Sequence, residues 1–163
     1  NFARIKSVMS VLLKTTKIIN EWTDYNNHMN LSYYILVFDK AAEKMLSNFK
    51  MGEEAAINTK RSTMVVETHT TYNNEVKEGE EVDIYLSYCD HDKKRLHYKL
   101  EMYEKSKNVL SSTTEVLALY INLELRKVAE FEKEKIQIMN NFIEENKSKF
   151  KFDNLQFSNK LKK

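Results

Sequence analysis

The stretch LSYYILVFDKAAEKMLSNF, residues 31–49, decides the fold. Its spacing predicts a helix, and the six residues from Tyr33 to Phe38 make its first turns apolar on every side. A helix with that pattern is normally buried. The later turns are amphipathic, and either Asn30 or Ser32 can cap the start. The sequence therefore predicts a helix that the rest of the chain has to enclose.

Segments with strand character flank this helix. They run from about Val8 to Trp22, and then over residues 63–75, 81–89, 95–104 and 109–123, where β-branched and aromatic residues are frequent. Short polar joints at 77–79, 90–94 and 105–108 predict successive antiparallel hairpins. A second helix is expected over about 131–146. It is followed by a basic tail, residues 148–163, which either frays or orders on a neighbour.

This order of elements places one sheet around one apolar helix. We predict an α+β protein with a five-stranded, mostly antiparallel sheet wrapped around a long buried helix, plus a C-terminal helix. The 163 residues suffice for one domain, with a core over about 15–125 and the second helix and tail over 130–163. Open sheet edges favour pairing with another copy, so a homodimer or tetramer is expected.

The composition excludes several classes of partner and binding site. Lys and Arg number 26 against 24 Asp and Glu, a net charge of +2, so neither nucleic acid nor a membrane surface is an expected partner. Apolar runs no longer than six residues are too short to span a bilayer. Two glycines and no proline exclude phosphate loops and dinucleotide fingerprints, and no motif predicts a metal site. The single cysteine, Cys89, indicates a reducing cytoplasm.

The loop WTDYNNHMN, residues 22–30, carries the chemistry. Asp24 stands seven residues before the predicted helix, whose free amide groups and dipole can polarise a carbonyl oxygen. An aspartate held nearby can act on that carbonyl as a base or as a nucleophile. This pairing suits acyl transfer, whereas an isolated aspartate before a helix is often only a cap.

The pattern Asp-x-x-x-His-Met-Asn-x-x-Tyr-Tyr, residues 24–34, resembles the hot-dog thioesterases of the 4-hydroxybenzoyl-CoA thioesterase type. The likeness continues through 66–72, 75–79, 91–97 and 126–127, and covers about Lys17 to Phe131. It is similar in particular to the subgroup of betainyl-CoA thioesterases, some of which are fused behind a carnitine dehydrogenase. The resemblance implies the hot-dog fold and hydrolysis of an acyl-CoA bound between subunits. It implies no cofactor beyond the coenzyme A of the substrate.

The resemblance also assigns catalytic residues. Asp24 is the expected base or nucleophile. His28 either bonds the substrate or a catalytic water, or instead bridges the loop backbone, and Asn30 orders the loop or caps the helix. The family has glycine where this chain has Asn27. Because asparagine tolerates a left-handed backbone well, the turn is expected to survive.

The expected substrate-binding residues fall into three groups. Leu31 and Ser32 supply amides at the helix start. Lys94 and Arg95 either contact the phosphates of coenzyme A or form a solvated hairpin tip. The third group would surround the acyl group and comprises Trp22, Tyr25, Tyr33, Glu67 and His69.

The residues of this third group would suit a betaine-like substrate, because a trimethylammonium group favours contact with aromatic faces and with a carboxylate. The same aromatic residues also suit an aryl or short branched acyl group. Each has a structural alternative: Tyr33 packs in the core by default, and Glu67 either lines the acyl pocket beside His69 or faces solvent.

Two other functions remain open. A hot-dog hydratase pairs aspartate with histidine, but in a Gly-Asp-x-Asn-Pro-x-His setting that this chain lacks. A non-catalytic acyl-CoA-binding module is the stronger alternative, because Asn27 departs from the family pattern and the tail is unusual. Such a module would bind acyl-CoA without releasing thiol.

Overall fold

The computed structural model describes residues 10–163. Val8 and Met9, the start of the first predicted strand, lie outside the described residues. The strands are β1 (Val11–Lys17), β2 (Arg61–Tyr72), β3 (Glu81–His91), β4 (Arg95–Glu104), β5 (Val109–Asn122) and β6 (Lys127–Val128). The α-helices are α1 (Leu31–Asn48), α2 (Glu53–Thr59) and α3 (Lys133–Asn146), and short 3-10 turns cover Asn20–Trp22 and Lys147–Lys149.

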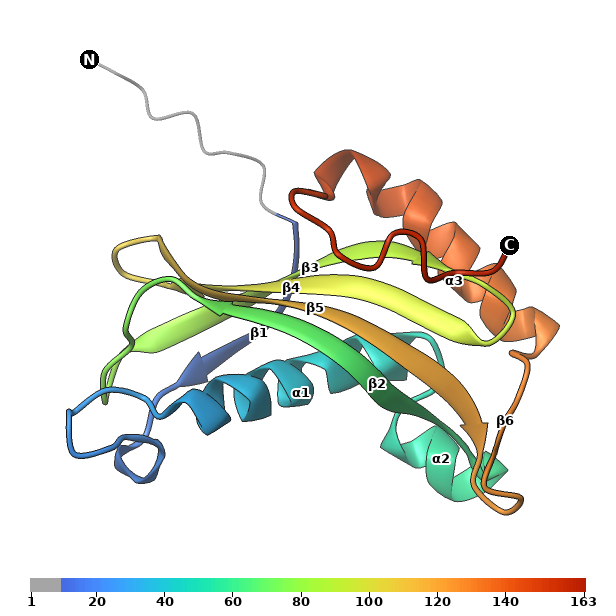
Figure 1. The fold of residues 1–163 in the computed structure, drawn as a ribbon, viewed down its shortest axis with the longest axis horizontal. Coiled ribbons are helices and arrows are strands. Elements are labelled where there is room, and N and C mark those ends of the chain that lie inside the picture. Colours follow the sequence, from blue (N-terminus) through green and yellow to red (C-terminus); the bar gives the residue numbers. More distant parts are fainter. Residues whose placement is uncertain (1–9) are drawn as a thin grey trace.

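The strands form one antiparallel sheet in the order β1-β3-β4-β5-β2, and β6 pairs with the end of β5. Figure 1 shows this sheet curling around α1, with α3 on its other side. The predicted architecture, a curled sheet around one helix with a C-terminal helix added, is confirmed. No helix of residues 10–163 is long and apolar enough to cross a membrane.

Helix α1 packs one side into the concave face of the sheet. Tyr34, Val37, Phe38, Ala41, Ala42 and Met45 are its buried residues. The expectation that its first turns are buried on every side is wrong, because Ile35 is 40% exposed and Leu31 is 63% exposed. These two side chains lie on the side of α1 that the sheet leaves uncovered.

The prediction of successive hairpins is wrong at the first joint. Strand β2 pairs with β5, and β3 pairs with β1, so the chain crosses from one edge of the sheet towards the other between them. That crossing is held by the loop before α1, because the Met29 amide donates to the Val76 carbonyl (2.7 Å) and His28 forms a β-bridge with Lys77. The contacts that decide this pairing are distant in sequence, which local hairpin signals cannot encode.

Three local predictions also need correction. The first strand ends at Lys17, not at Trp22, and residues 20–22 form a 3-10 turn. The polar connector after Gly52 contains α2, and β6 was not predicted. The segment 63–75 is displaced, since β2 covers 61–72.

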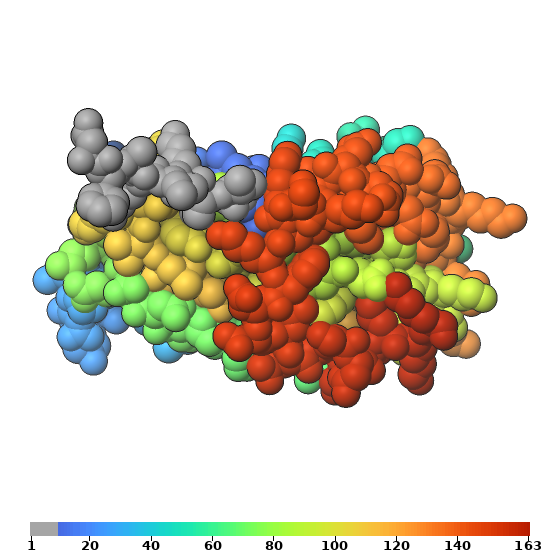
Figure 2. Space-filling view, turned by 90° about the horizontal axis from the view of Figure 1, so that it is seen from above, coloured from blue at the N-terminus to red at the C-terminus, as the bar shows by residue number. Residues whose placement is uncertain are grey.

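The C-terminal tail packs against the chain's own sheet, an arrangement that was not among those expected from the sequence. Figure 2 shows α3 and the tail lying across the outer face of the sheet. Phe157 is 4% exposed, and the Lys151 amide donates to Ser87 Oγ (2.9 Å). The Lys162 amide donates to Asp92 Oδ2 (2.8 Å) near the opposite end of the tail.

Candidate active site

The loop before α1 is a closed structure organised around Asp24. Its amide donates to the His28 carbonyl (3.0 Å), and its carbonyl accepts from the Asn27 amide (2.9 Å). The carboxylate atom Oδ1 accepts from the Asn26 amide at 2.8 Å. Asn27 has φ 61°, the left-handed conformation that asparagine tolerates. The turn therefore forms without the family's glycine and holds the half-buried Asp24 in a defined place.

Asn30 caps α1. Its Oδ1 accepts from the Ser32 amide (3.0 Å), and its carbonyl accepts from the Tyr33 amide (2.9 Å). The cap therefore occupies one of the two amides expected to bind substrate. Within residues 10–163, the groups left to donate at this helix start are the Leu31 amide and the Ser32 hydroxyl.

His28 is held by a carboxylate. Its Nε2 lies 2.5 Å from Oε2 of Glu75, and Lys77 Nζ lies 3.3 Å from the other oxygen of the same group. This ion pair ties the loop to the crossing between β2 and β3. The His28 ring contacts neither the loop backbone nor Asp24 through a hydrogen bond among the described residues; its partner is Glu75.

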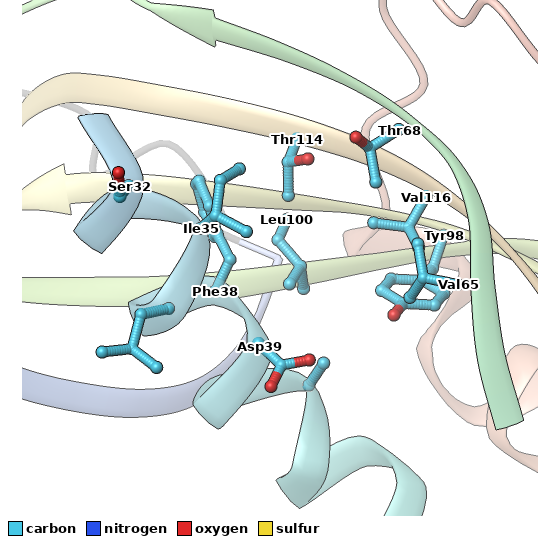
Figure 3. A pocket seen from close by; sticks show the side chains of 12 residues that line it. Ser32, Ile35, Phe38, Asp39, Val65, Thr68, Tyr98, Leu100, Thr114 and Val116 are labelled. Carbon is cyan, nitrogen blue, oxygen red and sulfur yellow. The ribbon is translucent and has the colours of Figure 1, made fainter. Parts of the chain in front are cut away.

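A cavity of about 400 Å³ opens beside this helix start. Its walls come from the uncovered side of α1 and from the concave face of β2, β4 and β5, as Figure 3 shows. The walls are mainly apolar, including Ile35, Leu100 and Val116. Ser32 lies at the end where α1 begins, and Asp24 is not among the lining residues.

Comparison with known proteins shows to which family the chain belongs. A model of the thioesterase-like superfamily matches residues 20–143, which include the loop, α1 and the cavity walls. The chain belongs to this superfamily. It is a thioester hydrolase by family, as its sequence predicted.

Relatives agree with that placement. A betainyl-CoA thioesterase of Pseudomonas aeruginosa is 30% identical over 128 residues, 77% of this chain and 80% of that protein. An L-carnitine dehydrogenase/betainyl-CoA thioesterase of Rhizobium meliloti is 26% identical over 68% of this chain, which spans only 22% of that longer protein.

Solved structures show the same fold. A Staphylococcus aureus protein in complex with CoA superposes with a TM-score of 0.78 at 23% identity, covering 91% of each chain. A 1,4-dihydroxy-2-naphthoyl-CoA thioesterase from Synechocystis gives a TM-score of 0.70 at 14% identity, covering 78% of this chain and 94% of the other. The hot-dog fold predicted for this thioesterase-like chain is confirmed.

The aromatic residues of the expected acyl pocket do not converge. Trp22 stacks on Tyr33 with ring centroids 6.0 Å apart, and Lys40 Nζ lies 5.5 Å from the Trp22 centroid. Tyr25 is 94% exposed. None of these three aromatic residues lines the cavity, and a cation of the chain itself already occupies a face of Trp22.

Glu67 and His69 lie on the other side of β2. Val65 and Thr68 line the cavity, and the strand has an irregularity between Val65 and Glu67. Glu67 instead forms an ion pair with Lys160 of the tail, Oε2 to Nζ 3.5 Å, on the outer face. In this chain Glu67 is therefore not part of the cavity wall and pairs with the tail, not with His69.

The basic turn between β3 and β4 is partly neutralised. Arg95 Nη1 lies 2.9 Å from Asp92 Oδ2, and the amides of Lys94 and Arg95 donate to Asp92 Oδ1. Asp92 is buried, and these hydrogen bonds lower its pKa against the opposing effect of burial. The turn lies near the start of α3, at the opposite end of the sheet from the loop that carries Asp24 (Figure 1).

Four polar residues of the cavity were not predicted, namely Asp39, Thr68, Tyr98 and Thr114, and two of them bear ionisable groups. Asp39 follows the apolar run in α1, and Tyr98 lies in the middle of β4; both line the cavity. Burial, and secondly the charge of Asp39, raises the pKa of the Tyr98 hydroxyl above its usual range. Asp39 stands seven residues after Ser32, two helix turns along one face, which is a signal the sequence did contain. Tyr98 has no such signal, since it reads as an ordinary strand residue.

Proposed function

We propose that this protein hydrolyses an acyl-CoA whose thioester carbonyl lies at the start of α1 and whose acyl group enters the cavity. One observation carries this proposal: Ser32 belongs both to the first turn of the Asn30-capped helix and to the wall of an apolar cavity. A carbonyl oxygen placed there can accept from the Leu31 amide or the Ser32 hydroxyl. The positive end of the helix dipole would stabilise the charge that develops on it.

Asp24 is the proposed catalytic residue. Its Oδ1 is held by the Asn26 amide, which leaves Oδ2 to act. As a base it takes a proton from water as the water attacks the carbonyl; as a nucleophile it forms an anhydride that water then hydrolyses. In both cases the C–S bond breaks and coenzyme A leaves as the thiol.

His28 and Asn30 are proposed as positioning residues. Asn30 directs the start of α1 through its two hydrogen bonds, and His28 ties the loop to Glu75. Both would act on the rate through Asp24 and the helix amides. Their replacement should therefore lower kcat more than it raises KM.

We further propose that two copies assemble through β2. Within the described residues this strand has a sheet neighbour on one side only, and Met64, Val65 and Val66 along it are 45–50% exposed. The cavity opens beside this edge and beside the exposed Leu31 and Ile35. A second copy on β2 would extend the sheet, cover these side chains and place the substrate between subunits.

The substrate class proposed is a short acyl group of the betainyl type. The 30% identical relative is named a betainyl-CoA thioesterase, and the CoA-bound structural relative supports coenzyme A as the carrier. A cytoplasmic location is proposed as well, since Cys89 is a free thiol.

The test is release of free thiol from betainyl-, short branched-, aromatic- and long-chain acyl-CoAs. Asp24→Asn should lower kcat by about 10²-fold or more, because the base or nucleophile is lost. Asp153→Asn, the same change on an exposed residue of the tail, is the control. Binding of acyl-CoA without thiol release by the unaltered protein would instead support the non-catalytic module.

A further inference from the structure

The cavity carries one charged group. Among the described residues that line it, Asp39 alone is charged; the others are apolar or neutral polar residues. Asp39 lines the cavity and is itself exposed to solvent. A substrate that fills the cavity would cover its carboxylate, which is costly unless a cation or hydrogen-bond donors accompany it. The protein's own lysine next to it, Lys40, is directed to the Trp22 ring instead.

Tyr98 accompanies Asp39 across the same space. The residue is 97% buried, as 3% of it is exposed, and no other residue of 10–163 forms a hydrogen bond with its hydroxyl. Figure 3 shows the hydroxyl and the Asp39 carboxylate directed towards one open region between α1 and the sheet. A tyrosine hydroxyl is neutral at physiological pH, and burial raises the pKa of Tyr98 further from that range. A negative charge and a neutral, electron-rich oxygen and ring thus face a volume that no side chain of the described residues fills.

We propose that Asp39, with Tyr98, is the specificity-determining site for a positively charged acyl group. This inference rests on the proposed thioesterase function and assigns the counter-ion for its substrate. The carboxylate would neutralise a quaternary ammonium, and the Tyr98 ring and oxygen would contact its methyl groups.

The spacing along α1 fits a small acyl group. Asp39 follows Ser32 by seven residues, a rise of about 10 Å along the helix. A betaine-sized acyl group, hydrogen-bonded through its carbonyl at one end and in contact with a carboxylate at the other, spans about the same distance.

The same observations argue against the aromatic cage expected from the sequence. Trp22 and Tyr33 stack on each other, Tyr25 points to solvent, and Glu67 pairs with the tail on the outer face. In this chain the acid that reaches the cavity is Asp39. The recognition proposed here therefore rests on charge neutralisation more than on aromatic enclosure.

The test compares two substrates of nearly identical shape. Betainyl-CoA and 3,3-dimethylbutanoyl-CoA differ in a single atom, because a neutral carbon replaces the quaternary nitrogen. The quantity measured is the ratio of kcat/KM for the charged substrate to kcat/KM for the neutral one. The unaltered protein should favour betainyl-CoA, and Asp39→Asn should lower the ratio by about tenfold or more.

Matched variants keep the result interpretable. Asp39→Glu retains the charge and should restore part of the ratio, whereas Tyr98→Phe should lower the ratio by a smaller factor than Asp39→Asn. Asp153→Asn should leave it unchanged. Thermal unfolding of each variant identifies one that fails to fold. If Asp39→Asn fails to fold, the unaltered protein carries the test, because equal kcat/KM values for the charged and the neutral substrate would overturn the assignment.

The possible failures are distinguishable. An unchanged ratio in a folded Asp39→Asn variant overturns the role of Asp39 and leaves the thioesterase intact. The same holds if the unaltered protein hydrolyses the neutral isostere as well as betainyl-CoA. If it releases thiol from no acyl-CoA in the panel, the proposed function itself fails.

Discussion

His97 and Glu115 form a buried hydrogen bond beneath the C-terminal tail, with Nε2 of the imidazole 2.7 Å from Oε1 of the carboxylate. The side chains are 2% and 4% exposed. The tail completes the arrangement, because the amides of Gln156 and Phe157 donate to the two oxygens of Glu115 at 2.6 and 2.8 Å. The carboxylate thus joins two neighbouring strands to a segment some forty residues further along the chain.

Removing Glu115 should be costly. Glu115→Ala leaves the His97 ring and two tail amides without their acceptor in a buried place, and loss of one partner of such a pair typically costs about 3 kcal/mol or more. Chemical denaturation measures the change in the free energy of unfolding. Glu124→Ala, which truncates an exposed side chain, should cost less than about 0.5 kcal/mol. Equal values for the two variants would contradict this account of the tail.

The tail itself offers a second matched pair. Phe157 is buried against the His97 ring, with centroids 6.2 Å apart, whereas Phe152 is 47% exposed. Phe157→Ala should destabilise the protein by about 3 kcal/mol and Phe152→Ala by much less, because only the first opens a cavity. Hydrogen exchange of residues 150–160 reports the same event locally. A tail that exchanges freely in the unaltered protein would show that it is not docked in solution.

The sequence predicted what local patterns encode. Apolar periodicity located α1, β-branched residues located most strands, and the Asn30 cap and the left-handed Asn27 followed from residue type. The pairing of β2 with β5 and the docking of the tail depend on contacts between distant residues, which no local pattern specifies. For the site, the spacing before a helix and the family resemblance led to the predictions for Asp24, Asn30 and Ser32, and the structure places all three at or near the start of α1. Asp39 was missed although it lies on the same helix face as Ser32, and Tyr98 was missed because only the folded sheet brings this strand residue to the cavity.

Cys89 should be unreactive in the folded protein. Burial is the main cause that raises the pKa of its thiol to about 12, and the charge of Glu115 adds to it. Since the thiolate is the reactive form, labelling with a disulfide reagent at pH 8 should be slow until the protein is unfolded. Labelling rates in native buffer and in denaturant test this. Rapid labelling of the native protein would show that the thiol is accessible and ionised.

The turn at Asn27 should position the Asp24 carboxylate without taking part in the reaction itself. Asn27→Gly keeps the left-handed conformation and should retain activity. Asn27→Ala removes the short polar side chain that helps a residue adopt φ 61°, and should cost about 1 kcal/mol of stability. If the turn positions the carboxylate, kcat should fall in the alanine variant and be restored by glycine, with KM little changed. Equal kcat in both variants would show that the exact geometry of this turn does not limit the reaction.

Assembly through β2 can be tested by introducing a charged residue into this strand. Val66 lies on this edge strand and is 50% exposed, and Leu12 in β1, at the other edge of the sheet, is 51% exposed. Val66→Lys should yield monomers and lose thioesterase activity, because a buried lysine in a continuous sheet is unfavourable and the proposed substrate site lies between the copies. Leu12→Lys also replaces an aliphatic residue of matched exposure by lysine, and should leave the oligomeric state and the thioesterase activity unaltered. Molar mass by light scattering, measured beside thiol release, decides the matter: a Val66→Lys protein that remains dimeric would place the interface elsewhere, and an active monomer would show that one copy holds a complete site.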